Sequence, residues 1–380
     1  MSVKELCHTI DSFKESIFST ITRKAIETGA INLAQGFPDF EGPKWIIDLA
    51  KEAMDEGKNQ YSASIGIRPL RQSIQTLYKK FYDLNFDADK DITVTNGATQ
   101  AIYLSIKAVI NPGDEVIIFE PFYDSYVGSI LLAGGVPVPV TLKGPSFEFD
   151  LKELENAFSD QTKLIIINTP HNPSGKIFTT KEYDQIATLV EKYDTYVLSD
   201  EVYEFLTFDN FKHTPVASHY KLKDRTITVS SAGKTFEFTG WKIGWAVAPA
   251  KITHAIRMIQ QFQVFCVAHP LQVAMGKAID RLDSYLPDFR ARYQAKRDFF
   301  IKGLQAAGYS PIIPNGTYFV LVPIDGNDDF SACMDLIEKK KVASIPPSSF
   351  YLKSDDGKKY LRFCFAKKFE TLEKACELLK

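Results

Sequence analysis

Two lysines stand among glycines, serines and aromatic residues in the stretch "SSAGKTFEFTGWKIGW", residues 230–245. A lysine in such surroundings is expected to be partly desolvated, which lowers the pKa of its amine and makes it a nucleophile for a carbonyl carbon. Lys234 is the candidate nucleophile, because it follows a glycine directly. Lys242 is expected to keep its charge and, together with Ser231, to bind an anion.

Two further stretches place polar residues where apolar runs end. "NGATQ" follows "DITVT" and brings Gly97, Ala98 and Thr99 to the start of an expected helix, where free N–H groups and the helix dipole favour an anion. Taken alone, these residues are explained more simply as helix capping. "TPHNPSG" follows "KLIIIN", and its Asn172 either belongs to a plain turn or donates an amide N–H to a ligand oxygen.

A carboxylate and two phenols occupy similar positions. "DEVY" follows "TYVLS", so that Asp200 stands at the end of an apolar run and Tyr203 three residues beyond. A buried carboxylate needs a cation or a hydrogen-bond donor, although an acid that only caps the next turn is an equally good reading. Tyr123 in "EPFYDSY" lies beyond another apolar run and could stack on a flat ring.

One ligand suits all of these residues, namely pyridoxal 5′-phosphate. Its electron-sink chemistry requires a protonated ring nitrogen, which a buried aspartate maintains. The assignment gives the phosphate to Gly97, Ala98, Thr99, Ser231 and Lys242, the ring nitrogen to Asp200, the ring oxygen to Asn172 and Tyr203, the ring face to Tyr123, and the aldehyde to Lys234.

Strands and helices that alternate must position these residues. Short apolar runs at 91–95, 115–119, 163–168, 195–200 and 226–230 are separated by amphipathic segments. This pattern predicts an α/β fold with a mostly parallel sheet, buried on both faces, whose ligand lies beyond the carboxyl ends of the strands.

The pattern changes after residue 270. An amphipathic stretch at 283–307, short β-rich runs and a final helix predict a smaller α+β domain. We expect an N-terminal segment at 1–40 that joins this small domain, a large cofactor-binding domain at 41–275, and the small domain at 276–380.

Composition excludes several classes of function. The 380 residues are too many for one ordinary domain, and a net charge of −2 offers no basic field for nucleic acid or an anionic membrane. The five cysteines are scattered without a Cys-x-x-Cys pair, which argues against a disulfide framework or a metal site and favours a reducing compartment. The N-terminus lacks the apolar run of a signal peptide, so we expect a cytoplasmic protein.

From about residue 17 to its end, the chain resembles the class I/II aminotransferases of fold type I, and within them the kynurenine/glutamine/methionine aminotransferase branch. The motifs that carry the resemblance occur in the family's order: "NLAQGFPDFEGP", "YSASIGIRPLR", "TNGATQAIY", "PGDEVIIFEPFYDSY", "NTPHNPSG", "LSDEVYE", "SSAGKTFEFTGWKIGW", "NGTYF" and "LRFCFAKK". The resemblance implies a large domain with a mostly parallel seven-stranded sheet flanked by helices, a smaller α+β domain, and a homodimer with shared active sites.

The resemblance also implies roles for individual residues. The internal lysine of the family, which bonds the cofactor and moves the substrate proton, matches Lys234. The arginine of "RFCFAKK" implies that Arg362 clamps the substrate α-carboxylate, with the backbone of Gly36 beside it. The tyrosine of "YSASIG" implies that Tyr61 reaches a phosphate across the dimer interface. One departure is Asn315, where the branch often has glutamine.

The function implied is a ping-pong transfer of the amino group of an L-amino acid to a 2-oxo acid. No second arginine stands in a matching motif to pair with a distal carboxylate, so large apolar, aromatic or neutral donors of the methionine, phenylalanine, tyrosine, kynurenine and glutamine type are expected over acidic ones. The expected walls of the side-chain pocket are Tyr61, Tyr123, Phe265, Phe18 and Phe350.

Two alternatives remain at this point. A cysteine-S-conjugate β-lyase shares the fold and the lysine, and acid–base positioning alone separates it from a transaminase. A non-catalytic protein of the same fold is the more remote alternative, since such a protein would be free to lose Lys234, Asp200 or Arg362, and all three are present.

Overall fold

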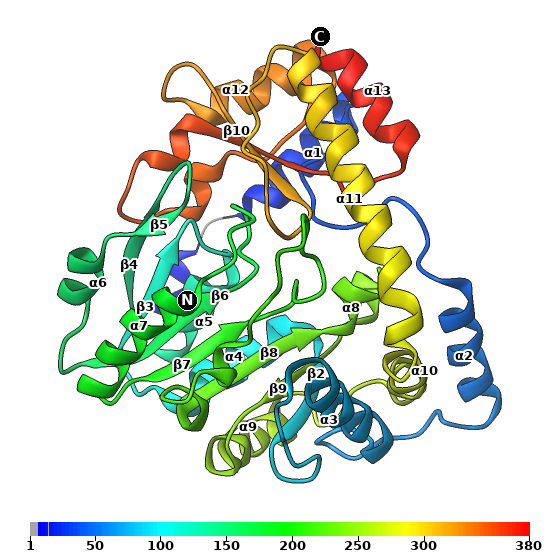
Figure 1. Ribbon diagram of the computed structural model, residues 1–380, viewed down its shortest axis with the longest axis vertical. Helices are drawn as coiled ribbons and strands as arrows, with labels where there is room; N and C mark the ends of the chain where they lie inside the picture. The colour runs from blue at the N-terminus through cyan, green and yellow to red at the C-terminus, as the bar shows by residue number, and fades with distance from the viewer. Residues whose placement is uncertain (1–6, 14) are drawn as a thin grey trace, which may run out of the picture.

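A computed structural model describes residues 7–13 and 15–380, and its largest element is an eight-stranded sheet (Figure 1). The strand order is β2-β9-β8-β7-β6-β3-β4-β5. The strands are β2 (Ile92–Asn96), β3 (Glu115–Glu120), β4 (Val136–Lys143), β5 (Glu148–Phe149), β6 (Thr162–Asn168), β7 (Tyr196–Asp200), β8 (Thr226–Ser231) and β9 (Ile243–Val247).

The sheet is mostly parallel, as predicted. β4, β3, β6, β7 and β8 pair in parallel, whereas β9 runs antiparallel between β8 and β2. The eighth strand, absent from the expected seven, is the two-residue β5, which pairs only with the last two residues of β4. β4 itself carries Pro137 and Pro139, which lack N–H donors; two prolines at alternate positions are tolerated here because this strand lies near the edge of the sheet.

Helices cover both faces of the sheet, which explains why the strands read as continuous apolar runs. In β3, Val116 and Ile118 pack with α4 (Gly97–Val109), α5 (Ser125–Ala133) and α9 (Ala250–Gln263). The alternate residues Ile117 and Phe119 pack with α6 (Leu151–Ala157) and α7 (Thr180–Lys192) on the opposite face. Neither face of the strand is therefore left for solvent.

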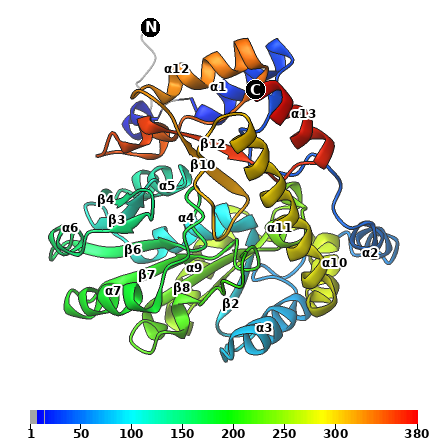
Figure 2. The same cartoon turned by 45° about the horizontal axis from the view of Figure 1, so that its top comes forward.

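Two further sheets have two strands each, and the one formed by β10 and β12 lies above the large sheet (Figure 2). β10 (Phe319–Pro323) pairs antiparallel with β12 (Tyr360–Cys364), and β1 (Ile31–Asn32) pairs parallel with β11 (Val342–Ala343). The remaining helices are α1 (Ile17–Thr28), α2 (Lys44–Asp55), α3 (Arg68–Tyr82), α8 (Ala232–Thr235), α10 (His269–Ile279), α11 (Leu282–Ala306), α12 (Asp329–Asp335) and α13 (Phe369–Leu379).

The pairing of β1 with β11 ties the N-terminal segment to the C-terminal part of the chain. We propose on this basis the division into residues 1–40, 41–275 and 276–380, of which residues 1–6 and 14 lie outside the described part. In the described ranges, no helix combines the length and the apolar composition needed to cross a membrane.

Candidate active site

The carboxyl ends of three neighbouring strands bring the predicted residues together. The register pairs Asn168 of β6 with Asp200 of β7, and Asp200 with Val229 of β8. The Asp200 carbonyl accepts hydrogen bonds from Asn168 Nδ2 at 2.9 Å and from the Thr169 N–H at 3.0 Å. These strand ends border a cavity of about 330 Å³ lined by Phe18, Gln35, Gly36, Phe37, Tyr123, Asn168, Asn172, Asp200, Val202, Tyr203, Lys234, Phe319 and Arg362.

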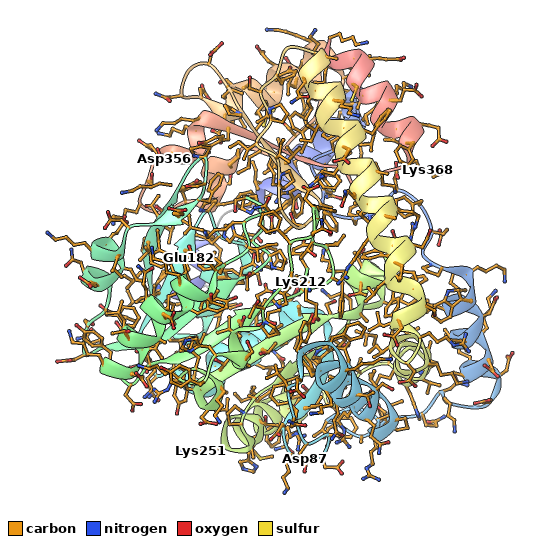
Figure 3. All side chains as sticks on the ribbon, viewed as in Figure 1. Asp87, Glu182, Lys212, Lys251, Asp356 and Lys368 are labelled. Carbon is orange, nitrogen blue, oxygen red and sulfur yellow. The ribbon has the colours of Figure 1, made fainter. Side chains whose placement is uncertain are left out.

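Side chains otherwise fill the space between the large sheet and the elements above it (Figure 3). Of the residues assigned from the sequence, Tyr123, Asn172, Asp200, Tyr203, Lys234 and Arg362 all line this one cavity, as does the Gly36 backbone. The cavity is thus built from residues spread over more than 300 positions of the chain.

Asp200 is a buried carboxylate at the base of the cavity, with 3% of its surface exposed. Its Oδ2 accepts a hydrogen bond from the Tyr126 hydroxyl at 2.6 Å, and its Oδ1 accepts one from the Val202 N–H at 3.3 Å. Burial raises the pKa of this carboxyl from 3.8 to about 6, against the opposing effect of the Tyr126 hydrogen bond. No cationic side chain among the described residues forms an ion pair with Asp200. Its buried carboxylate is therefore available to a cationic group of a ligand.

Lys234 lies on the four-residue helix α8, directly after β8. Its Nζ donates to the Tyr318 hydroxyl at 2.8 Å and lies 3.4 Å from the Gly36 carbonyl oxygen. Burial lowers the pKa of this amine from 10.5 to about 8. The position of Lys234 therefore agrees with the expectation that its amine is desolvated. A substantial share of the amine is neutral near pH 8.

A glycine-lined seat lies at the N-terminus of α4, where the first helical N–H groups have no acceptor within the helix. Gly97 has φ +70°, and a Cβ there would lie 3.0 Å from Lys242 Cε. A Cβ on Gly244 would lie 2.5 Å from the Gly97 carbonyl carbon, so β9 can approach α4 only as glycine. Lys242 Nζ lies 3.4 Å from Thr99 Oγ1, so a cation and a hydroxyl lie beside each other at the N-terminus of α4.

Ser231 is the N-cap residue of α8, the helix that carries Lys234. Its Oγ accepts from the Gly233 N–H at 3.2 Å and donates to the Ile243 carbonyl at 3.4 Å. Because Ile243 opens β9 directly after Lys242, this bond ties the start of β9 to the end of β8. Ser231 thus helps to build the seat and keeps a lone pair for a further donor.

Aromatic and amide groups surround the cavity. Tyr123 is half-buried and packs edge-to-face on Tyr126, with ring centroids 5.6 Å apart. Tyr203 is 4% exposed and packs edge-to-face on Tyr318 at 5.2 Å. Asn172 accepts a hydrogen bond from Arg362 Nη1 at 3.2 Å, which turns its amide N–H₂ away from the guanidinium.

Arg362 is a buried cation, with 1% of its surface exposed, on β12. Its Nη2 donates to the Ala34 carbonyl at 2.9 Å, and its carbon Cζ lies 4.3 Å from the centre of the Phe319 ring. Among the described residues, its Nε has no hydrogen-bond partner and no carboxylate forms an ion pair with it. Burial lowers the pKa of the guanidinium to about 10. A buried arginine in this state is ready to take a carboxylate from a ligand.

Three residues of the predicted pocket wall lie elsewhere. Tyr61 is 84% exposed and packs edge-to-face on Phe265, with centroids 5.3 Å apart. Both belong to the outer surface of the chain and do not line the cavity. Phe350 is buried 5.1 Å from Arg362 Cζ, behind the lining rather than in it. Phe18 and Tyr123 do line it.

Reasoning from the sequence missed several residues that organise the cavity. Tyr126 holds Asp200, Asn168 accepts from the Asn172 N–H at 2.7 Å, and Tyr318 contacts Lys234. All three lie inside or beside motifs that were noticed, namely "EPFYDSY", "KLIIIN" and "NGTYF". For Tyr126 and Asn168, the spacing of three or four residues from Tyr123 and Asn172 was the available signal; for Tyr318 it was only its place in the motif.

The residues present fit pyridoxal 5′-phosphate. The unpaired buried carboxylate of Asp200 matches a protonated ring nitrogen, and the seat around Gly97, Thr99 and Lys242 matches a phosphate. Lys234, with its lowered pKa, matches an aldehyde.

Comparisons with known proteins agree with this geometry. The family model described as aminotransferase class I and II matches residues 28–379. The chain is 39% identical to the methionine aminotransferase of Escherichia coli, over 96% of this chain and 95% of that protein. It is 38% identical to the kynurenine–oxoglutarate transaminase of Dictyostelium discoideum, over 96% of this chain and 93% of that protein.

Solved structures give the same result. A crystal structure from Escherichia coli, reported with a methionine aminotransferase function, matches with a TM-score of 0.95 at 37% identity, over 100% of this chain and 99% of that chain. The N-succinyldiaminopimelate aminotransferase of Mycobacterium tuberculosis matches with a TM-score of 0.95 at 35% identity, over 99% of both chains. The predicted resemblance and fold are therefore confirmed, and the chain belongs to the class I and II aminotransferases.

Proposed function

We propose that this aminotransferase binds pyridoxal 5′-phosphate through the residues described above and takes its amino group from large apolar, aromatic or neutral L-amino acids. The observation that supports this substrate class is the small number of cationic side chains that line the cavity. Two cations, Lys234 and Arg362, line it, and both are already assigned to the common part of every amino acid. The rest of the lining is mainly aromatic or apolar, including Phe18, Phe37 and Phe319.

Lys234 is proposed as the group that moves the substrate proton. When bound, the cofactor supplies an electron sink for the charge that develops at the donor Cα. The Lys234 amine would take the proton from the donor Cα and would later give that proton back. Its lowered pKa, about 8, keeps it neutral for enough of the time to act as a base near neutral pH.

Arg362 is proposed to bind the donor α-carboxylate. Its free Nε and its Nη2 offer parallel N–H groups, a geometry that matches a carboxylate. Asn172, held by Arg362 Nη1, keeps its N–H₂ for an oxygen of the ring, and Tyr203 is proposed to donate to the same oxygen. Asp200 would keep the ring nitrogen protonated, and Tyr123 would cover the ring face.

An acidic side chain would enter this cavity at a cost. A carboxylate buried without a cation loses several kcal/mol of solvation that nothing repays. An apolar donor instead gains about 0.8 kcal/mol for each CH₂ that leaves water. The names of the relatives, methionine aminotransferase and kynurenine–oxoglutarate transaminase, support the same donor class.

We also propose a cytoplasmic homodimer with shared active sites. The supporting observation is a surface patch of Tyr61 and Phe265, which pack on each other and are exposed by 84% and 48%. Phe262, exposed by 88%, precedes Phe265 by three residues. Phe262 belongs to α9, and Tyr61 follows α2, so the patch joins two parts of the large domain. A second copy that covers this patch would remove it from water and would carry Tyr61 to its neighbour's phosphate seat.

A donor screen tests the substrate assignment. Purified protein loaded with cofactor is supplied with one 2-oxo acid and a panel of L-amino acids, and the products are separated by chromatography. Methionine and the aromatic amino acids are expected to rank highest, whereas aspartate or glutamate as best donor would contradict the pocket assignment. Pyruvate and ammonia released from a cysteine conjugate without any oxo acid would reveal the β-lyase instead.

A further inference from the structure

One buried phenol joins the three chain segments that meet at the reacting amine. Tyr318, 1% exposed, lies directly before β10, and its hydroxyl is 2.6 Å from the Gly36 carbonyl oxygen and 2.8 Å from Lys234 Nζ. We propose that Tyr318 is a positioning residue, which aims the Lys234 amine into the cavity and locks it to the Gly36 segment. It does not line the cavity, so it acts through these two partners.

The direction of both hydrogen bonds follows from the number of protons. A carbonyl oxygen has no proton, so two oxygens 2.6 Å apart require that the phenol donates its only proton to Gly36. The phenol oxygen then has only lone pairs left for Lys234, and Lys234 must donate. The contact with Gly36 therefore makes Tyr318 an obligatory acceptor for the amine.

This arrangement orients the free amine. A neutral lysine amine has two N–H groups and one lone pair. Its N–H groups have acceptors in the Tyr318 oxygen at 2.8 Å and the Gly36 oxygen at 3.4 Å. With both N–H groups drawn to this side, the lone pair is left for the cavity, where the proton of the donor must be collected. Without the phenol, only the longer contact with the Gly36 carbonyl oxygen, at 3.4 Å, would orient the amine.

Gly36 belongs to a segment whose carbonyls are all held by side chains. Arg362 donates to the Ala34 carbonyl at 2.9 Å, and Lys367 Nζ lies 2.7 Å from the Phe37 carbonyl and 3.5 Å from that of Gln35. Of these donors in the described chain, Tyr318 alone also contacts Lys234. It therefore couples the segment beside the carboxylate clamp to the base.

Other groups also affect the pKa of the Lys234 amine, and a test of Tyr318 must leave them unchanged. Its pKa is lowered first by burial, then raised by Cys364 and Asp200, and lowered by Lys242 and Arg362. The Tyr203 ring centre lies 5.7 Å and the Tyr318 ring centre 5.5 Å from Nζ. A substitution that removes only the Tyr318 oxygen leaves all of these in place.

Tyr318→Phe is this substitution, and Tyr293→Phe is its matched control. Tyr293 is also buried, and its ring lies 6.3 Å from that of Tyr318. Among the described residues its hydroxyl has no hydrogen-bond partner, so its removal should leave Lys234 unchanged. Both variants keep the aromatic packing, and circular dichroism with urea unfolding checks that both fold.

The first readout is the pKa of the Lys234 amine in the full-length chain without cofactor. It is measured by the pH dependence of labelling with a small amine reagent, followed by peptide mass spectrometry. Loss of an acceptor for the charged amine should lower this pKa by about one unit in Tyr318→Phe and leave it unchanged in Tyr293→Phe. Equal values in the two variants would overturn the inference.

The second readout is turnover, and its meaning rests on the proposed function. Tyr318→Phe should lose kcat/KM for methionine by roughly ten- to a hundredfold, mostly in kcat, whereas Tyr293→Phe should match the parent. A parent protein without transaminase activity would count against the proposed function, while the labelling result would still decide the role of Tyr318. If Tyr318→Phe does not fold, a chain with 3-fluorotyrosine at position 318 keeps ring and hydroxyl but accepts more weakly, and a Lys234 pKa identical to the parent's would contradict the inference.

Discussion

Replacing Asp200 with asparagine should make the cofactor-free protein more stable while it destroys the enzyme. Burial raises the pKa of the Asp200 carboxyl from 3.8 to about 6, so the folded chain binds this proton more tightly than the unfolded chain. A difference of about two units corresponds to about 3 kcal/mol of penalty on the charged form. The penalty is absent below pH 3.8, grows as pH rises towards 6, and is complete above it.

Asparagine removes this penalty at a smaller cost. Its single oxygen cannot accept from both the Tyr126 hydroxyl and the Val202 N–H, which both oxygens of Asp200 do now. One hydrogen bond lost is worth about 1 kcal/mol. The net gain for Asp200→Asn is therefore about 2 kcal/mol at pH 8, and it should shrink and then reverse as the pH falls towards 4.

Urea unfolding of the full-length chain without cofactor at pH 5 and pH 8 measures this difference. The exposed Asp160→Asn serves as the control and should leave the unfolding midpoint unchanged at both values. With cofactor bound, the ring nitrogen supplies the missing cation, so the order of stabilities should invert and turnover should fall to a small fraction. A parent as stable as Asp200→Asn at pH 8, or a difference that does not change with pH, would refute the reasoning.

Further outcomes follow from the same site. Borohydride treatment of the yellow, cofactor-loaded protein should fix a pyridoxyl group on Lys234, found by peptide mapping; a label on another lysine contradicts the assignment, and Lys234→Ala should bind cofactor without turnover. Arg362→Lys should lower kcat/KM by roughly 10- to 100-fold for every donor without changing their ranking, because lysine cannot offer two parallel N–H groups; a changed ranking would mean that Arg362 also selects side chains. Mixing Tyr61→Phe with Lys234→Ala subunits should restore activity through hybrids with one intact site; subunit exchange seen by mass spectrometry without recovery argues against shared sites.

The ends of the strands could be predicted from the sequence, because a strand buried on both faces is a continuous run of apolar residues. Asp200 and Ser231 end apolar runs, and a parallel sheet must bring such ends together. β4 was not predicted, because two prolines argue against a strand unless that strand lies near the edge of the sheet, and its place in the sheet is known only from the structure. β9 was not predicted, because "IGWAV" is short and directly follows Lys242, in a motif that was interpreted only as part of the binding site.

Directions of side chains could not be read in this way. Tyr126 and Tyr318 stand in recognisable motifs, but the sequence does not say that one phenol points to Asp200 and the other to Lys234. Tyr61 and Phe265 were grouped with the pocket wall because their types suit it, yet within one chain they lie on the surface. A role for them at the site depends on a second copy, which is information that a single chain's pattern does not hold.

The pairing of β1 with β11 also dictates when the site can form during synthesis. Ile31 and Asn32 find their partners only when Val342 and Ala343, about 310 residues further along the chain, have left the ribosome. Gly36 follows β1 closely, and Arg362 emerges later still. A nascent chain can therefore complete the large sheet and the proposed phosphate seat, whose residues end at Lys242 and Gly244, long before Arg362, the proposed carboxylate clamp, has been made. Translation itself delays turnover until Arg362 has emerged.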